Sequence, residues 1–313
     1  MTAAELAKKL GYSIFGCPNR KVQGVSFASD ARPGDVAIVF HKNEIKKTSA
    51  DIIVTEPTIL FDKSKTFLYS HEPIQLSLIK IAKELISAGI CVDYSRQSKP
   101  ELTPDGFSIG KNVAIGRHTQ ICTGVSIYDN VTIGDNCYIG SNTVIYGGVY
   151  IADNVQIGSN CTIGANAFYR HHEQFQKIFC GVGTVHIETN VNIGNNVIIQ
   201  RGTLSRTFIG ASSCLGNLID IGHDVTIGKN CFIVSQTGIA GNSTVGNNVT
   251  LYGQVGVANN VSIGDNVIVH AQASVTKNIR SDSEISGRYS FNHKDELRCI
   301  AEMRRKIKKK ENE

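Results

Sequence analysis

One histidine of this chain stands where a side chain can do chemistry. His223 lies in the segment Ile221-Gly222-His223-Asp224-Val225, two residues after an aliphatic residue of a regular repeat. The aliphatic residue is expected to face a core, and His223 to point out of it. A neutral imidazole, whose reference pKa is about 6.5, can accept a proton near pH 7 and act as a general base. Asp220 and Asp224 flank the histidine, and either carboxylate could orient its ring.

The repeat that positions His223 has a period of six residues. Aliphatic residues recur at every sixth position from Ile109 to Ile163, again from Ile187 to Ile199, and in a new phase from Ile209 to Val275. Neither an α-helix nor a flat strand has this period. Gly and Asn at fixed places allow φ > 0, so each hexad is expected to be a short strand and a tight corner. The pattern is typical of a mainly β fold, a left-handed parallel β-helix with three hexads per coil, and predicts about eight coils over residues 101–285.

Three hexads per coil bring residues 18 positions apart to the same edge of the helix. Gly241 lies 18 residues after His223 and is therefore expected beside it, and Asn260 lies two coils and one residue beyond His223. Alternatively, Gly241 and Asn260 are only the glycine and asparagine that tight corners need.

The repeat breaks twice before His223. Residues 164–186 lose the hexad pattern but keep its phase, and residues 200–208 shift the phase. Such breaks are either tolerated surface insertions or binding loops. Arg201 and Arg206 near the second break could meet phosphate. The candidate substrate-binding residues are Gln200, Arg201, Asn217 and Tyr169.

Both ends of the chain lack the repeat. Residues 1–100 predict a small α/β domain, with a first helix at AELAKKLG, strands around Pro33-Gly34, short buried strands at ADIIVT and TILFD, and a helix opened by Pro73. Residues 286–313 predict a helical tail with a thin apolar stripe and a basic run from Arg304 to Lys310. That tail could pack against other copies of the chain, or it could dock an acidic partner.

Composition limits the class of protein. A net charge of +5, dispersed until the tail, does not indicate nucleic-acid binding. The nine cysteines form no CxxC pair, and Cys137, Cys161 and Cys231 fall at inward positions of the repeat. An odd count without a disulfide framework favours a reducing cytoplasm. The N-terminus lacks the apolar core of a signal peptide, and no stretch approaches the roughly 18 apolar residues of a membrane span.

No metal site is predicted. His171, His172 and His186 lie on or beside the first break, but their spacing is not that of a ligand set. A hexapeptide-fold carbonic anhydrase, which needs zinc ligands from adjacent coils, is therefore disfavoured.

The order of these parts resembles the UDP-3-O-acylglucosamine N-acyltransferase family of hexapeptide-repeat enzymes, and the resemblance covers nearly the whole chain. It is clearest in GVSFASDARPGDVAIVF, NVNIGNNVIIQRGTL, LGNLIDIGHDVTIG, QTGIAGNSTVG and YGQVGVANNVSIGDNV. The family places its catalytic histidine in the context of Ile221-Gly222-His223-Asp224-Val225. The resemblance implies a homotrimer without a permanently bound cofactor that moves an acyl group from acyl-CoA or acyl carrier protein to a nucleotide-linked amino sugar. His223 would be the general base, the Gly241 N–H the oxyanion donor and Asn260 a polar partner.

This chain departs from the family's pattern in three places. Gln200 stands where the family has Asp, and Asn260 stands where it has a second histidine. The aromatic pair that holds uracil in the family falls on Ile38 and Glu44. These differences favour a divergent member that acylates another nucleotide amino sugar for a cell-surface glycan or lipopolysaccharide. The alternatives are a strict lipid A enzyme, which uses 3-hydroxyacyl carrier protein, and a solenoid scaffold without catalytic activity.

Overall fold

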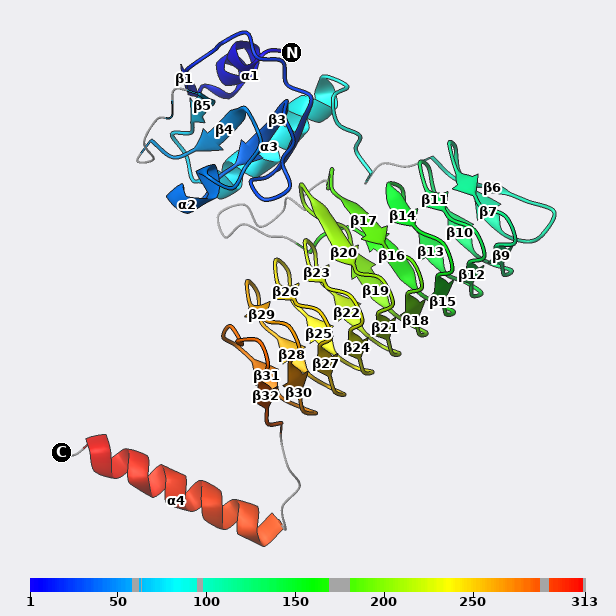
Figure 1. Cartoon of the computed structure of the whole chain (residues 1–313), viewed down its shortest axis with the longest axis vertical. Helices are drawn as coiled ribbons and strands as arrows, with labels where there is room; N and C mark the ends of the chain where they lie inside the picture. Colours follow the sequence, from blue (N-terminus) through cyan, green and yellow to red (C-terminus); the bar gives the residue numbers. More distant parts are fainter. Residues whose placement is uncertain (58–61, 63, 95–97, 169–180, 288–292, 312–313) are drawn as a thin grey trace.

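The computed structural model describes residues 1–57, 62, 64–94, 98–168, 181–287 and 293–311. A small N-terminal domain lies beside the middle coils of a long solenoid, and a C-terminal helix stands away from the last coil (Figure 1). The mainly β fold predicted from the six-residue period is confirmed. A division of the chain at residues 100 and 285 remains a prediction.

The N-terminal domain is a five-stranded sheet covered by helices. Its strand order is β1 (Ser13–Phe15), β5 (Thr66–Tyr69), β4 (Ile52–Thr55), β3 (Asp35–Ile38) and β2 (Gly24–Phe27), with only β1 antiparallel to its neighbour. The helices are α1 (Ala3–Leu10), α2 (Lys42–Ile45) and α3 (Ile74–Ser87). Helix α1 begins with a capping box between Thr2 and Glu5 and ends at Gly11, whose φ of 72° suits glycine. Helix α3 follows Pro73 as predicted.

The sequence did not single out one strand of this domain. The TILFD segment lies, apart from Asp62, outside the described residues, and Asp62 is not in a strand. The strand that pairs with β4 is instead β5, in the segment TFLY, whose four residues are all buried. Because so short an apolar run has no clear periodicity, the TFLY segment gave no separate signal.

The solenoid has three parallel sheets, which we call faces 1, 2 and 3 in the order in which the chain visits them. Face 1 contains β7 (Ser108–Ile109), β10 (Ser126–Ile127), β13 (Val144–Ile145), β16 (Thr162–Ala165), β19 (Ile198–Gln200), β22 (Asp220–Ile221), β25 (Gly238–Ile239), β28 (Gly256–Val257) and β31 (Ser274–Val275), with β6 (Glu101–Leu102) antiparallel at its end. Face 2 contains β8 (Ala114–Ile115), β11 (Thr132–Ile133), β14 (Val149–Ile151), β17 (Thr184–Ile187), β20 (Arg206–Ile209), β23 (Thr226–Ile227), β26 (Thr244–Val245) and β29 (Ser262–Ile263). Face 3 contains β9 (Gln120–Ile121), β12 (Tyr138–Ile139), β15 (Gln156–Ile157), β18 (Asn192–Ile193), β21 (Cys214–Leu215), β24 (Phe232–Ile233), β27 (Thr250–Leu251), β30 (Ile268–Val269) and β32 (Glu284–Ile285).

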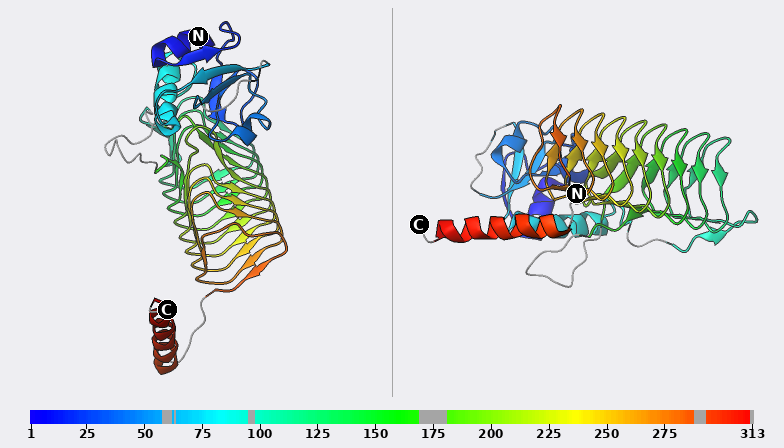
Figure 2. Two further views of the ribbon diagram at one scale, coloured as in Figure 1. Left: turned by 90° about the vertical axis from the view of Figure 1, so that its left-hand side faces the viewer. Right: turned by 90° about the horizontal axis from the view of Figure 1, so that it is seen from below.

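The register of the strands confirms three hexads per coil. Ile127 pairs with Ile145 and Ile145 with Ile163, each 18 residues on. The aliphatic ladders fill the interior of the stacked coils together with Cys137 and Cys161. The stacking of the coils can be followed in Figure 2. The corners between strands place Asn at φ near 60°, for example Asn130 at 58°. Asn tolerates this conformation better than other non-glycine residues, so the sequence pattern and the corner geometry agree.

The second break in the repeat fastens the N-terminal domain to the solenoid. Leu204 is buried in the hydrophobic core of the N-terminal domain. The Ser205 hydroxyl lies 2.9 Å from that of Ser26, and it accepts a hydrogen bond of 3.1 Å from the backbone N–H of Phe27. Residues 200–208, which shift the phase of the repeat, therefore dock the N-terminal domain, and we call them the docking segment. They lie where the domain meets the middle coils (Figures 1 and 2).

Among the described side chains of helix α4 (His293–Glu311), the large apolar ones of Leu297, Ile300 and Met303 are exposed. The predicted C-terminal helix is thus confirmed. Over the part of the chain that the structure describes, no helix is both long and apolar enough to cross a membrane.

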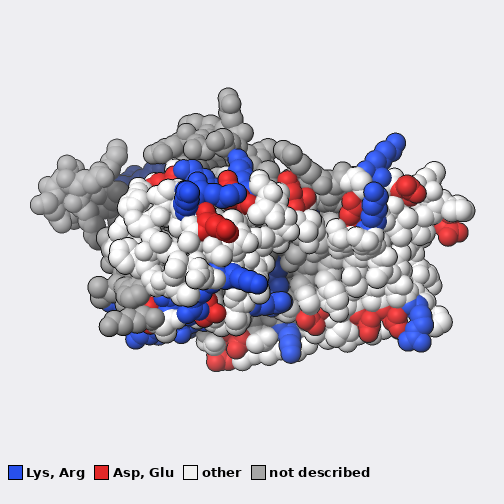
Figure 3. Space-filling view, turned by 90° about the horizontal axis from the view of Figure 1, so that it is seen from above, with Lys and Arg blue, Asp and Glu red and all other residues white. Residues whose placement is uncertain are grey.

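Charge is mixed over the surface. In the view of Figure 3, Lys and Arg side chains alternate with Asp and Glu over the N-terminal domain and along the solenoid. A strong affinity for nucleic acid depends on many basic side chains that neutralise phosphates together. This view shows no continuous basic face of that kind.

Face 2 carries a ladder of rings whose stability depends on pH. His186 lies between Tyr150 and Phe208, with ring centroids 4.4 and 5.6 Å away. Burial lowers the pKa of His186, although Glu188 opposes this. A folded-state pKa below the unfolded value means that the unfolded chain binds more protons. The stabilising contribution is therefore present above the ordinary histidine pKa and is lost as the pH falls.

We expect the melting temperature to fall between pH 7 and pH 5 in part because of this ladder. His186→Phe should make that fall smaller, whereas His118→Gln, at an exposed corner, should leave it unchanged. Thermal melts at both pH values measure the difference, and an equal fall in wild type and His186→Phe would contradict the assignment.

Candidate functional site

The corners that lead from face 1 to face 2 form one continuous edge, which we call the histidine edge. Successive coils place four tripeptides on it: Gln200-Arg201-Gly202, Gly222-His223-Asp224, Ala240-Gly241-Asn242 and Ala258-Asn259-Asn260. The first break in the repeat also leaves the solenoid from this edge, because it follows β16 of face 1 and precedes β17 of face 2. Both breaks in the repeat therefore lie between a strand of face 1 and a strand of face 2, on the edge that carries His223.

His223 and Asp224 form a hydrogen-bonded pair. Nδ1 of His223 lies 3.0 Å from Oδ2 of Asp224. A carboxylate only accepts, so Nδ1 carries the proton and Nε2 is left as the acceptor in the neutral ring. This is the tautomer that a general base needs. The histidine was expected to point out of the core, and it stands outside the aliphatic ladders, yet only 6% of it is exposed.

The orienting carboxylate is Asp224 and not Asp220, which the sequence offered as a possible orienter. Asp220 accepts instead from Nε2 of Gln200, at 3.4 Å, and partial desolvation raises the pKa of Asp220. The two aspartates differ because Asp220 ends up in strand β22, whereas Asp224 turns the corner at φ 57°. Only the corner residue can fold its side chain back onto the ring.

Gly241 lies against the Nε2–Cε1 edge of the imidazole of His223. A Cβ at this position would be 2.6 Å from Nε2 of His223 and 2.7 Å from its Cε1. Such distances are shorter than atoms tolerate, so the ring occupies the space that a side chain would need. The prediction that Gly241 lies beside His223 is therefore confirmed as geometry; its role remains a proposal.

The backbone N–H of Gly241 is free of the bond that corners usually make. At the same place in other corners, the N–H donates to an Asp or Asn side chain one coil on, as from Lys229 to Asn247 at 2.9 Å and from Asn247 to Asp265 at 2.6 Å. Within the described residues, no acceptor takes the Gly241 N–H. It is thus a donor beside Nε2 that a ligand could use.

Asn260 occupies its corner at φ 58°, and its N–H donates to the Gly241 carbonyl at 3.2 Å. It therefore supports the backbone of Gly241 from the next coil. This contact accounts for its position without a direct role in chemistry, and a polar role for its side chain stays a prediction.

The other candidate binding residues are scattered. Oε1 of Gln200 accepts from the N–H of Phe168 at 3.0 Å, so Gln200 holds the start of the first break. Asn217 lies on the edge between faces 3 and 1, where its Oδ1 accepts from the N–H of Asn195 at 2.7 Å. Within one copy of the chain, Asn217 is thus not part of the histidine edge. Tyr169 lies outside the described residues.

Arg201 is interior, so the prediction that it contacts substrate is wrong for this structure. Its side chain is fully buried, and it donates to the carbonyls of Gly147, at 3.2 Å, and Gly164, at 2.7 Å. Its guanidinium carbon lies 5.5 Å from the centroid of the Tyr94 ring. Burial lowers the pKa of Arg201 to about 10, which still leaves it charged at neutral pH. The residue joins three distant segments instead of facing a ligand.

We expect Arg201→Ala to destabilise the protein by about 3–5 kcal/mol, because it leaves a cavity and two buried carbonyls without donors. The matched control is Arg117→Ala, which removes an exposed arginine and its 3.0 Å ion pair with Asp135. That change should cost no more than about 1 kcal/mol. Urea unfolding of both variants measures the difference, and equal costs would show that the burial of Arg201 is not stabilising.

An aromatic pair that the sequence did not single out lies at the domain junction. The rings of Phe27 and Phe40 are 6.2 Å apart between centroids and tilted by 38°. By contrast, the two positions aligned with the family's uracil pair are structural, since Ile38 is fully buried and Glu44 accepts from the N–H of Phe40 at 2.9 Å. The signal that could have found the pair is that both phenylalanines come at the ends of neighbouring parallel strands, β2 and β3.

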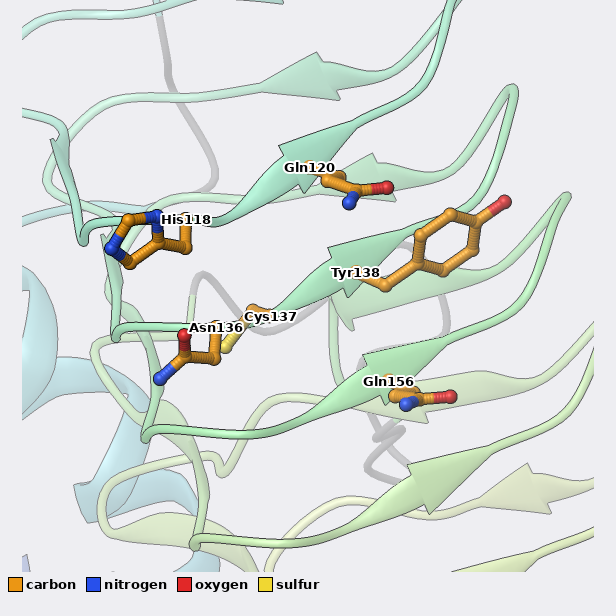
Figure 4. Close-up of a pocket in the computed structure, with 6 residues that line it drawn as sticks. All are labelled: His118, Gln120, Asn136, Cys137, Tyr138 and Gln156. Carbon is orange, nitrogen blue, oxygen red and sulfur yellow. The ribbon is translucent and has the colours of Figure 1, made fainter.

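One hollow of the surface lies away from the histidine edge. A cavity of about 390 Å³ on face 3 is lined by His118, Gln120, Asn136, Cys137, Tyr138 and Gln156 (Figure 4). These residues come from the first coils and are far along the solenoid from His223 (Figure 1). In the described part of the chain, no group of three or more His, Cys, Asp or Glu side chains is placed to hold a metal ion.

The repeats are of a kind found in bacterial transferases. The family model described as bacterial transferase hexapeptide (six repeats) matches residues 108–147 and 136–168. A second model, hexapeptide repeat of succinyl-transferase, matches residues 218–253, which include both His223 and Gly241.

Two similar proteins are both named UDP-3-O-acylglucosamine N-acyltransferase. The one from Rhizobium meliloti (strain 1021) is 53% identical over 60 residues, which are 19% of this chain and 17% of the relative. The one from Rickettsia canadensis (strain McKiel) is 47% identical over 73 residues, which are 23% of this chain and 20% of the relative. The matched segment is thus about a fifth of the length of these relatives. A solved structure of UDP-N-acetylglucosamine acyltransferase from Campylobacter jejuni aligns with a TM-score of 0.53 and 18% identity, over 60% of this chain and 72% of that one, which shows a shared fold.

Proposed function

We propose that this protein is an N-acyltransferase that moves an acyl group from an acyl thioester to the amino group of a nucleotide-linked amino sugar. The observation that carries the proposal is the His223–Asp224 pair, whose Nε2 faces Gly241 at the edge of a hexapeptide solenoid. The relatives' names support the reaction class, since the matched segments belong to N-acyltransferases of a UDP-linked amino sugar.

The site's groups suit each step of acyl transfer. The amine of the sugar attacks the thioester carbonyl carbon while Nε2 of His223 accepts the proton that the nitrogen loses. The electron pair of the carbonyl moves to oxygen, and the N–H of Gly241 stabilises the oxyanion. The tetrahedral intermediate collapses with loss of the thiolate, which takes the proton from the imidazolium. The products are an amide and a free thiol, and His223 returns to its starting state.

The substrates are expected to reach His223 from two sides. The junction of the N-terminal domain offers the Phe27–Phe40 pair, whose rings could hold a nucleotide base, since bases stack on aromatic side chains. The N-terminal domain would therefore bind the nucleotide. The thioester is supplied by acyl-CoA or by acyl carrier protein, and the enzyme works as a cytoplasmic homotrimer, with the groove between neighbouring solenoids holding the donor.

The experiment is a matrix of donors and acceptors. Purified protein would be offered acetyl-CoA or 3-hydroxyacyl carrier protein, each with UDP-3-O-acylglucosamine or with a nucleotide-linked amino-deoxysugar, and the product would be read by mass spectrometry. Transfer from acetyl-CoA to an amino-deoxysugar is expected for a surface-glycan enzyme, and transfer from the carrier protein to UDP-3-O-acylglucosamine for a lipid A enzyme. Absence of an amide product in all four combinations would favour the scaffold alternative.

A further inference from the structure

Three consecutive residues of the docking segment, Thr203, Leu204 and Ser205, contact two parts of the molecule, the Asp224 corner and the N-terminal domain. Thr203 contacts Asp224, Leu204 is buried in the core of the N-terminal domain, and Ser205 bonds to Ser26 and Phe27 of that domain. Adjacent residues of this segment thus connect the N-terminal domain to Asp224, the carboxylate that is hydrogen-bonded to His223.

The contact with Asp224 is unusually complete. The hydroxyl of Thr203 donates to Oδ2 of Asp224 at 2.7 Å, and its backbone N–H donates to Oδ2 at 2.9 Å and to Oδ1 at 3.1 Å. Thr203 and His223 are both almost fully buried. Oδ2 therefore receives donors from Thr203 on one side and from Nδ1 of His223 on the other, so its direction is fixed.

The backbone of Asp224 is also held in a way that regular corners are not. At a regular corner, the N–H of the residue with positive φ donates to a carbonyl of the preceding coil, as from Asn242 to His223 at 2.9 Å. At Asp224 the acceptor is the Thr207 hydroxyl, at 2.9 Å. The phase shift changes which group of the preceding coil faces Asp224, and a threonine side chain takes the place of the carbonyl.

Gly202 allows this approach. A Cβ on Gly202 would lie 2.8 Å from Oδ1 of Asp224 and 2.7 Å from the Ser205 carbonyl oxygen. The absence of a side chain before Thr203 therefore lets the segment close onto the carboxylate. The contact between the docking segment, Asp224 and the N-terminal domain therefore depends on four residues, Gly202, Thr203, Ser205 and Ser26.

We propose that Thr203 is a positioning residue, and that residues 203–205 form a strut through which the N-terminal domain sets the orientation of Asp224 and hence of His223. The proposal deepens the proposed function and rests on it for its kinetic readout. Its consequence is that a change in the N-terminal domain at Ser26 or Phe27 reaches the catalytic base without touching it.

The test compares Thr203→Val with Thr203→Ser. Valine keeps the shape and the backbone N–H but removes the hydroxyl donor, so we expect kcat to fall about 10- to 100-fold, with little change in KM for the acyl donor, because a hydrogen bond to a charged group is lost. Serine restores the donor and should stay within about threefold of wild type. Ser205→Ala removes the bond to the N-terminal domain and should lower kcat several-fold, whereas Leu102→Ala, at an exposed leucine of β6, should change nothing.

A second readout does not depend on activity. The ¹⁵N shifts of the His223 ring, assigned by their absence in a His223→Gln sample, report which nitrogen carries the proton. Thr203→Val should move these shifts toward a mixture of tautomers, and Thr203→Ser should leave them as in wild type. Unchanged shifts with unchanged kcat in Thr203→Val, or equal damage from serine and valine, would overturn the positioning role, and wild-type kcat in Ser205→Ala would overturn the strut. If Thr203→Val altered the ring shifts while the wild-type protein showed no transferase activity, the positioning role of Thr203 would stand and the proposed acyltransferase function would be rejected.

Discussion

Replacement of His223 by Gln should lower kcat/KM by about 10²- to 10⁴-fold, the usual contribution of a positioned general base. Glutamine keeps a polar side chain of similar reach, and its amide N–H can still donate to Asp224, but it cannot accept a proton from the attacking amine. The fold should be preserved, because His223 stands outside the aliphatic ladders of the solenoid. Steady-state kinetics with the best donor and acceptor pair provide the measurement.

The matched control for this variant is His270→Gln. His270 also follows a solenoid strand, and its Nε2 lies 2.7 Å from Oε1 of Glu284. The strand is β30 of face 3, near the last coil, so His270 is not on the histidine edge. Its loss should not change the rate. If His223→Gln kept a rate within threefold of wild type, no base at this edge would be needed, and the proposed chemistry would have to be abandoned.

The parts of this architecture that were predictable from sequence are those set by local repetition. A six-residue aliphatic period is typical of a β-helix with three hexads per coil, and with that coil the 18-residue register, the buried Cys137 and the contact of Gly241 with His223 all follow. The same arithmetic could have placed Asn217 correctly. It lies six residues before His223, which is one corner earlier and therefore on another edge.

The parts that were not predictable depend on contacts between distant segments. Arg201 stands in a polar break beside glycines and resembles a surface arginine, yet Tyr94 and the carbonyls of Gly147 and Gly164 enclose it. The choice of Asp224 over Asp220 follows from which one turns the corner at positive φ. Thr203 gave no signal at all, because its role exists only once the phase shift has brought it onto the next coil.

Gly241→Ala should also lower kcat strongly, by about 10²- to 10³-fold. The added methyl group would lie 2.6 Å from Nε2 and 2.9 Å from Cδ2 of His223, so either the ring or the corner has to move. Gly241 is not among the residues with positive φ, so alanine meets no backbone penalty there. The damage therefore falls on the ring, which must turn away from the place where the amine and the oxyanion donor meet.

The control for steric change alone is Gly253→Ala. Gly253 occupies the same place in a corner on a different edge, and its Cβ would meet only ordinary contacts, the nearest at 3.5 Å from the Ser235 carbonyl oxygen. This variant should keep both the rate and the melting temperature of wild type. A large loss of activity in Gly253→Ala would mean that corners in general are too rigid for the comparison to be informative about His223.

A double variant separates the two ways in which Gly241 can matter. If alanine acts by displacing the base, then Gly241→Ala should cost little further rate once His223 has become Gln, because the imidazole that the methyl group displaces is no longer present. If alanine acts by moving the backbone N–H away from the oxyanion, the two losses should instead multiply. The kinetics of the two single variants and the double variant therefore distinguish displacement of the proton acceptor from loss of the oxyanion donor. Full activity in Gly241→Ala would remove His223 from the mechanism, since a ring that tolerates a methyl group at that distance is not held where the structure places it.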